Sequence, residues 1–227
     1  MIEQIKKLII EKTDGDTSGH GLDHVERVFT LAMKFASQEK ANGDVVAIAS
    51  LLHDVDDYKI VGIEKSKHFH NAKEIMAKVG IDNETQKQIT EIIKTIGYSN
   101  SLCGVRPATL EGKIVSDADM CDAIGAHGIV RSIVYAVSPK GNGVIFDKDI
   151  LPNFNITYEQ YNSAGTTHDT DNAINHFFEK LLKLKDMMMT KSGKQEAEKR
   201  HKIMVDFLRN FFEEEGATQW VDLLKNF

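Results

Sequence analysis

The sequence has little cysteine and proline, and no apolar run long enough to cross a bilayer. It holds 2 cysteines and 3 prolines in 227 residues. Two cysteines are too few for a disulfide framework, which predicts a reducing compartment, and we expect Cys103 and Cys121 to be small core residues rather than nucleophiles. The N-terminal segment is amphipathic and has no signal-peptide pattern. We therefore expect a cytoplasmic protein with no membrane partner.

An excess of basic residues is also lacking. The chain has 28 Lys and Arg against 34 Asp and Glu, for a formal net charge of −6. A duplex nucleic acid is bound through many phosphate contacts, so this balance argues against such a partner and leaves room only for a local basic pocket. The hydrophobic content of 41% is that of a folded protein, and the length is sufficient for one sizeable core. We predict a single domain over 1–227.

Strand patterns are not evident, whereas helical periodicity covers most of the chain, so the sequence predicts an all-α fold. Ser66 and Asn83 are expected helix starts, and Gly80, Gly97 and Gly193 are expected stops. The expected helices are 2–13, 22–40, 44–55, 67–79, 84–97, 108–124, 126–137, 172–191, 194–214 and 217–225.

The region 138–171 interrupts this pattern with proline, glycine, asparagine and aspartate. Loops of this length are usually functional, so we expect a lid over a functional site, with a short helix near 157–162; a plain connector is the alternative. The loop divides an N-terminal helical core, 1–137, from C-terminal helices in 172–227.

The most informative residues are His53 and Asp54, which end the apolar segment VVAIASLLHD. An imidazole beside a carboxylate at the end of a buried helix is costly unless a partner such as a metal ion compensates. Upstream, His24 begins an amphipathic helix and shares a face with Arg27. Downstream, the segment KIVSDADMCDAIGA carries three aspartates among small and apolar residues. One histidine, a His-Asp pair and a later aspartate make a set of two nitrogen and two oxygen ligands.

This order resembles the H…HD…D motif of the HD superfamily of metal-dependent phosphohydrolases. HVERV is similar to the family's first-histidine helix, LLHDVDDYK to its HD segment and IVSDADMCDAIGA to its last-aspartate helix. The segments NHFFEKLLKLKDMM and AEKRHKIMVDFL resemble the C-terminal helices of small bacterial members. The resemblance implies an HD-type helical bundle with a C-terminal helical hairpin.

The resemblance also implies a metal site formed by His24, His53, Asp54 and Asp119. Such a site suits Mn, Co, Ni, Fe or Zn and less readily Mg, and we favour one Mn ion. The implied activity is hydrolysis of a phosphoester or phosphoanhydride through a metal-activated water, of the nucleotidase or pyrophosphohydrolase type. In the family the last ligand is the aspartate after alanine, which here is Asp119, with Asp122 on the same face. Asp117 is the alternative ligand.

Four further residues are candidates near the metal. Asp57 is a candidate general base, or else a carboxylate of a solvated turn. Arg27 and Lys59 are candidate phosphate contacts, because guanidinium and ammonium groups suit phosphate oxygens. His20 is a candidate substrate contact, or a solvated ring at the helix entry. The expected substrate is a small phosphorylated molecule, most plausibly a nucleotide, and the expected assembly is a monomer or homodimer.

Two alternatives use the same residues differently. A dinuclear-iron oxygenase on this scaffold requires at least two more ligands, and His68 and His70 lie in the right part of the chain but point apart on a helix. A nucleotide-binding sensor without turnover shares the four ligands. His176 and Lys180 are placed to close the pocket from a later helix, or to form its polar face.

Overall fold

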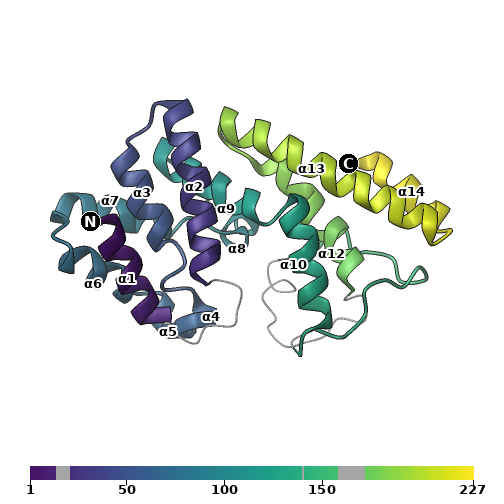
Figure 1. The fold of residues 1–227 in the computed structure, drawn as a ribbon, viewed down its shortest axis with the longest axis horizontal. Coiled ribbons are helices and arrows are strands. Elements are labelled where there is room, and N and C mark those ends of the chain that lie inside the picture. Colours follow the sequence, from purple (N-terminus) through teal and green to yellow (C-terminus); the bar gives the residue numbers. More distant parts are fainter. Residues whose placement is uncertain (14–20, 140, 158–171) are drawn as a thin grey trace. The chain divides into compact units, whose positions relative to one another are not determined.

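The computed structural model describes residues 1–13, 21–139, 141–157 and 172–227. Throughout these ranges the regular structure consists of α-helices and short 3-10 helices, which confirms the predicted all-α fold (Figure 1). The chain separates into two compact units, Met1–Asp119 and Met120–Phe227. The sequence prediction of a single domain stays a prediction. His20 and nearly all of the short helix expected near 157–162 lie outside the described residues.

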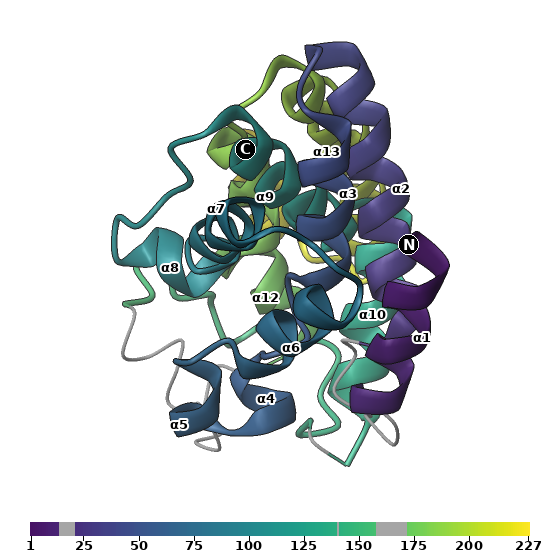
Figure 2. The same cartoon turned by 90° about the vertical axis from the view of Figure 1, so that its left-hand side faces the viewer.

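Unit 1 is built around a buried helix, α3. Every residue from Val45 to Leu52 is buried there, as the apolar run predicted, and α1, α2 and α7 pack against α3. Figure 2 looks onto this unit, with the short helices α4 and α5 near the start of α6. Its helices are α1 (Ile2–Thr13), α2 (Leu22–Glu39), α3 (Gly43–Leu52), α4 (Tyr58–Val61), α5 (Ile63–Ser66), α6 (His70–Lys78), α7 (Asn83–Ile93), α8 (Tyr98–Leu102) and most of α9 (Leu110–Asp122).

Unit 2 has an aromatic core. Phe178, Phe212 and Trp220 are fully buried, and the Trp220 ring lies 5.5 Å from Phe212 and 5.6 Å from Phe178, centroid to centroid. The indole nitrogen of Trp220 donates to the carbonyl of Lys148 at 3.1 Å, which ties the loop 141–157 to this core. Its helices are α10 (Gly125–Val137), α12 (Ala173–Glu179), η1 (Leu181–Met187), α13 (Lys191–Glu214), α14 (Thr218–Leu223) and η2 (Leu224–Asn226).

Both ends of α9 are fixed by hydrogen bonds. Near its start, Glu111 accepts from the backbone N–H of Asn42 at 3.1 Å, and Asn42 in turn caps α3. Near its end, Arg200 donates to the carbonyl of Cys121 at 2.7 Å. The next helix begins at Gly125 with φ +82°, and a Cβ there would lie 3.0 Å from the Arg200 side chain, so a larger residue would be both strained and crowded.

Several predicted boundaries are wrong. The helix predicted over 44–55 ends at Leu52, so Asp54 lies in a turn. The helix start predicted at Ser66 falls at His70, because Ser66 ends α5. Gly193 is in the first turn of α13 rather than at a helix end, and its N–H is capped by the Thr190 hydroxyl at 3.0 Å.

Two more sequence expectations need correction. The stretch 172–191 forms α12 followed by the 3-10 helix η1 instead of one helix, and Gly97 precedes α8 instead of ending α7. Of the two cysteines, Cys121 is buried as expected, whereas Cys103 is exposed. The exposure of Cys103 follows from its place just after the short helix α8, none of whose residues is buried.

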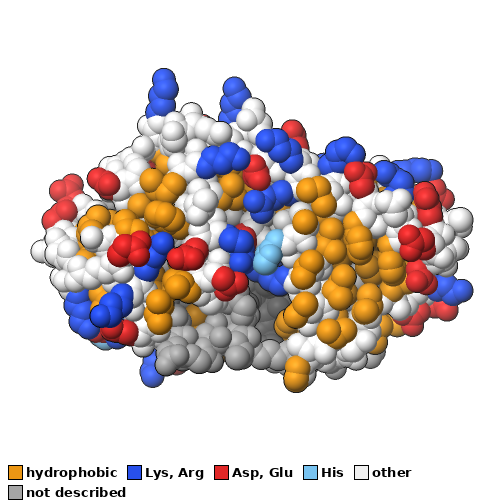
Figure 3. Space-filling view, viewed as in Figure 1, with side chains coloured by type: hydrophobic (Ala, Val, Ile, Leu, Met, Phe, Trp, Pro, Cys, Tyr) orange, Lys and Arg blue, Asp and Glu red, His pale blue; other side chains and the backbone are white. Residues whose placement is uncertain are grey.

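Apolar side chains gather on part of the surface of unit 2 (Figure 3). On α10, Val130, Val134, Tyr135 and Val137 each have more than half of their surface exposed. Among the described residues no single helix combines the length and apolarity needed to cross a membrane; α9 and α10 reach that threshold only as a bent pair.

His176 gives unit 2 a pH-dependent stability. The partial burial of the His176 side chain, together with the charges of Lys180 and Arg131, lowers the pKa of His176 from 6.5 to about 3. The unfolded chain takes up this proton below about pH 6.5 while the folded chain does not, so the free energy of unfolding decreases as the pH falls from 6.5 toward 3. In His176→Gln that decrease should be smaller, by at most about 2 kcal/mol at pH 5. Urea unfolding at pH 7.5 and pH 5 measures it, and parallel pH dependences of the two proteins would contradict the assignment.

Candidate metal centre

His24 is placed by the amphipathic helix α2. Its apolar face buries Val25, Val28 and Phe35 against unit 1, and His24 lies in the first turn with only 2% of its surface exposed. The helix begins at Leu22 after Gly21, whose backbone is extended. A buried imidazole needs partners for its ring nitrogens, so the burial of His24 has to be explained by the polar groups that surround it.

His53 is placed by the end of α3. Its Nδ1 lies 2.7 Å from the carbonyl oxygen of Ser50, one turn earlier. A carbonyl oxygen can only accept, so Nδ1 carries the proton and the Nε2 of the neutral ring keeps its lone pair. This bond fixes both the orientation and the tautomer of His53, as backbone carbonyls commonly do for metal-bound histidines.

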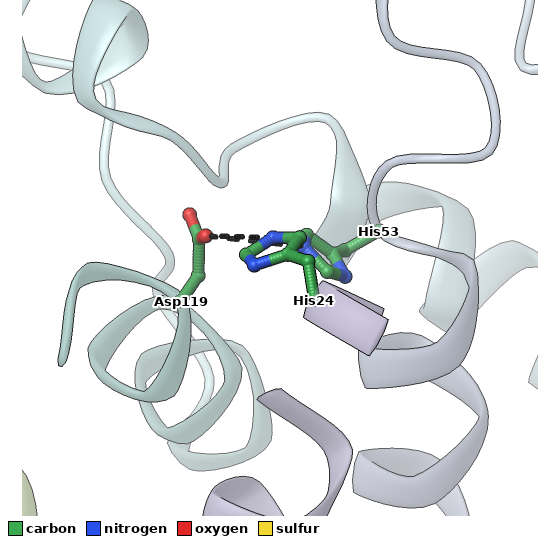
Figure 4. A group of neighbouring side chains, drawn as sticks. All are labelled: His24, His53 and Asp119. Atoms are coloured by element: carbon green, nitrogen blue, oxygen red, sulfur yellow. Dashed lines mark hydrogen bonds and ion pairs between the residues drawn. The ribbon is translucent and has the colours of Figure 1, made fainter. Parts of the chain in front are cut away.

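Four side chains from three segments converge at this point. The Nε2 atoms of His24 and His53 are 3.2 Å apart. Asp54 Oδ2 lies 3.3 Å from the His24 nitrogen and 3.4 Å from the His53 nitrogen. From α9, Asp119 Oδ1 lies 3.6 Å and 3.9 Å from the same two nitrogens. Figure 4 shows His24, His53 and Asp119 pointing toward one another, and their ligand atoms all lie within 4.8 Å of each other.

These distances fit a shared cation. Donors about 2.0–2.2 Å from one ion lie about 2.9–3.6 Å apart when they occupy neighbouring octahedral or tetrahedral positions. Four of the five distances fall in that interval. The fifth, 3.9 Å between His53 Nε2 and Asp119 Oδ1, is slightly longer, and a small movement of a side chain would bring it into the interval. The donor set of two imidazoles and two carboxylates suits a first-row transition ion. The residues present therefore fit a divalent metal.

The cluster is closed on the histidine side and more open on the carboxylate side. The side chains of His24 and His53 are 3% and 0% exposed, whereas those of Asp54 and Asp119 are 16% and 23% exposed. An ion held here would have protein on one side and access to a small molecule on the other.

The other predicted residues are placed as follows. Arg27 has a partly exposed side chain whose Nη1 binds Asp23 Oδ2 at 3.0 Å, and this ion pair lowers the pKa of Asp23. Asp57 is half-buried in the segment just before α4. Lys59 belongs to α4, but its side chain lies outside what the structure describes, as does the whole of His20.

The aspartates of α9 differ in position. Asp119 joins the cluster, while Asp117 is fully buried and lies outside the group of possible ligands found among the described residues. Asp122 is 2% exposed, one turn beyond Asp119. Residues two apart on a helix project in different directions, which agrees with these placements of Asp117 and Asp119.

His68 and His70 do not approach the cluster. Both are exposed, and His70 faces Glu74 on its own helix, with 3.9 Å between Nε2 and Oε2. Within the described part of the chain, His24, His53 and Asp119 form a group of possible metal ligands, and Asp54 lies close enough to His24 to be the fourth. This arrangement offers ligands for one ion.

One residue beside the site was missed by sequence reasoning. Asp56 precedes Asp57 in the stretch for which a solvated turn is one of two alternatives. It is only 6% exposed and accepts hydrogen bonds from the backbone N–H groups of Asn71 and Ala72 at 3.0 and 2.8 Å. Its partners lie 15 and 16 residues away in the sequence. No local sequence signal indicated this role, because the N-cap position of α6 is occupied by Phe69, which gives no side-chain cap, and the acceptor comes from a distant part of the chain.

Comparison with known proteins agrees with this site. The HD domain family model matches residues 21–124, a range that contains all four converging side chains. The Bacillus subtilis protein YpgQ is 33% identical over 211 residues, covering 91% of this chain and 90% of YpgQ. Its crystal structure in complex with ADP, 28% identical, matches with a TM-score of 0.70 over 94% of this chain and 97% of that one.

Two further crystal structures are similar over nearly the whole chain. A Lactobacillus plantarum protein is 34% identical with a TM-score of 0.77, and a Bacillus thuringiensis HD-superfamily hydrolase is 32% identical with a TM-score of 0.73. Each comparison covers 95% of this chain and 97% of the other. From this whole-length likeness and the matched HD domain it follows that the chain belongs to the HD superfamily of hydrolases.

Proposed function

We propose that this protein is a divalent-metal-dependent phosphohydrolase that acts on a nucleotide or another small phosphorylated metabolite. The observation that carries the proposal is the convergence of two buried imidazole nitrogens, 3.2 Å apart, on two carboxylates that are more open to solvent. His24, His53, Asp54 and Asp119 are the proposed ligands. A divalent ion, when bound, supplies Lewis acidity toward a phosphoryl oxygen and acidifies water.

A nucleotide is the favoured substrate class because YpgQ, which shares the fold and a third of the sequence, has been crystallised with ADP. HD scaffolds carry several activities, so the likeness in fold does not choose among them. The donor chemistry near the cluster favours an anionic substrate. Arg27 lies one turn along α2 from His24, and a guanidinium offers paired donors to phosphate oxygens. We propose that Arg27 exchanges Asp23 for a substrate phosphate.

Asp57 is the proposed general base. It follows Asp54 by three residues, and its backbone N–H donates to the carbonyl of Asp54 at 2.9 Å, so the two belong to one turn. A carboxylate in this position can accept the proton of an attacking water if it lies within hydrogen-bond reach. Lys59, two residues further on, is the proposed second phosphate contact.

Substituting Asp119 tests the ligand set. In Asp119→Asn the weaker amide ligand should lower Mn²⁺ affinity by more than about 100-fold, since even partners outside a ligand shell cost 10–100-fold. Asp117→Asn is the matched control, two residues away on the same helix, and should keep the wild-type metal content. Elemental analysis and calorimetric titration of metal-stripped protein measure both. Loss of metal from Asp117→Asn with retention in Asp119→Asn would reverse the assignment.

A nucleotide panel tests the activity. We expect wild-type protein supplied with Mn²⁺ to release inorganic phosphate or pyrophosphate from at least one nucleoside mono-, di- or triphosphate, and EDTA to abolish the release until excess Mn²⁺ restores it. Chromatography of the nucleotide product separates the two cleavage positions. Tight nucleotide binding with no product from any substrate would instead support the sensor alternative and exclude hydrolysis.

Asp57→Asn separates catalysis from metal binding. If Asp57 is the base, kcat should fall by about 10²–10⁴-fold, because a positioned general base contributes about that much. Mn²⁺ affinity and the KM for the best panel substrate should stay close to wild type. Equal losses of kcat and metal content would place Asp57 in the metal site, and unchanged kcat would return it to the solvated-turn interpretation.

A further inference from the structure

Asp56 connects the turn that carries the HD pair to a helix of the core. Its two carboxylate oxygens accept from the N–H groups of Asn71 and Ala72, at the start of α6. A third bond runs alongside, from the side-chain amide of Asn71 to the carbonyl of Val55 at 3.3 Å. Asp56 and Val55 are both buried, at 6% and 2% exposure, so these bonds are shielded from water.

Helix α6 has no cap of its own. The residue at its N-cap position, Phe69, has a left-handed backbone with φ 51° and makes no side-chain hydrogen bond to the helix. The first N–H groups of a helix lack intrahelical acceptors, and a carboxylate there is favoured both as a hydrogen-bond acceptor and by the helix dipole. Asp56 therefore serves α6 as a cap from a distant part of the chain.

The segment between Asp56 and α6 has few buried contacts. Residues 57–70 contain α4 and α5, and none of their described side chains is buried. Segments with few buried contacts open at low free energy and are the more mobile parts of a protein. Asp56, two residues after Asp54, joins the start of this segment to its end through the bond from Asn71.

Helix α6, to which Asp56 is bonded, is well packed. Within α6, Ala72, Ile75 and Met76 are fully buried, and the helix packs against α1 and α7. The turn on the near side holds the metal cluster, where His53 already bonds to Ser50 but Asp54 extends beyond the last residue of α3. Asp54 thus depends on the turn, rather than on the helix, for its position.

We propose that Asp56 is a positioning residue for the metal centre, whose carboxylate fixes the turn bearing His53 and Asp54 to α6 and isolates the ligands from motion of residues 57–70. This inference rests on the proposed function, because it assumes that the cluster binds a metal. It requires no contact between Asp56 and the ion or the substrate.

The test compares Mn²⁺ affinity in variants that weaken different helix contacts. Asp56→Ala should raise the Kd for Mn²⁺ by about tenfold or more, the range seen when residues supporting metal ligands are replaced. Asp82→Ala is the first control, since Asp82 caps α7 by accepting from Glu84 and Thr85, both at 3.0 Å, in the same manner. It should lower Tm by a few degrees, as lost caps do, with Kd unchanged.

Glu74→Gln is the second control. Glu74 holds the side of α6 through Lys12 at 2.7 Å and Lys78 at 2.8 Å, so its loss loosens the helix without touching the link to the turn. Kd for Mn²⁺ should stay at the wild-type value in this variant. A tenfold weakening here as well would make the effect a general consequence of destabilising α6 and would overturn the role of Asp56.

Hydrogen exchange gives a readout that does not depend on activity. In Asp56→Ala the amides of Val55 and Asp57, which bond within the turn, should exchange faster, whereas those of α3 should not. If Asp56→Ala fails to fold, Asp56→Asn retains one acceptor oxygen and decides the matter: a raised Kd supports the inference and an unchanged Kd overturns it. Wild-type protein that takes up no Mn²⁺ would refute the metal centre itself, a result distinct from equal binding by wild type and Asp56→Ala.

Discussion

The close approach of two buried imidazole nitrogens is the constraint on which the rest of unit 1 depends. When the Nε2 atoms of two neutral rings lie 3.2 Å apart, their lone pairs repel unless a proton or a cation lies between them. The carboxylates of Asp54 and Asp119 beside them favour a positive charge at this point. The supporting bonds make sense in this light. Ser50 sets the tautomer of His53, and Glu111 ties the start of α9 to the cap of α3, so that the helices carrying the ligands keep their spacing.

The sequence predicted what depends on local pattern. The apolar run before His53 predicted a helix buried all round, and α3 is buried from Val45 to Leu52. The spacing of apolar residues after His24 predicted α2 with its buried face. The resemblance to HD proteins selected Asp119 from the three aspartates of α9, and Asp119 is the one that approaches the histidines. Periodicity and motif order are properties of contiguous segments, which a sequence contains directly.

What escaped prediction depends on contacts between distant residues. Asp56 reads as a turn carboxylate because nothing near it in the sequence indicates a helix start 15 residues later. Ser66 reads as a helix start because serine is a good cap, yet Ser66 ends α5, and α6 begins at His70 with the carboxylate of Asp56 accepting from its first turn. Gly193 reads as a stop, but the Thr190 hydroxyl accepts from its N–H and Gly193 lies in the first turn of α13. In each case a hydrogen bond outweighed the local preference of a single residue.

The position of Asp54 outside the helix has a further consequence for how the site can work. A ligand on a helix moves only with the whole helix, whereas a ligand on a turn moves with whatever fixes that turn. His24 and Asp119 belong to helices, and His53 is held by α3 through Ser50. Asp54 is also one of the two more exposed of the four side chains. The same turn continues into Asp57 and residues 57–70, none of whose described side chains is buried, so the bonds of Asp56 lie between the turn that carries Asp54 and this more open segment.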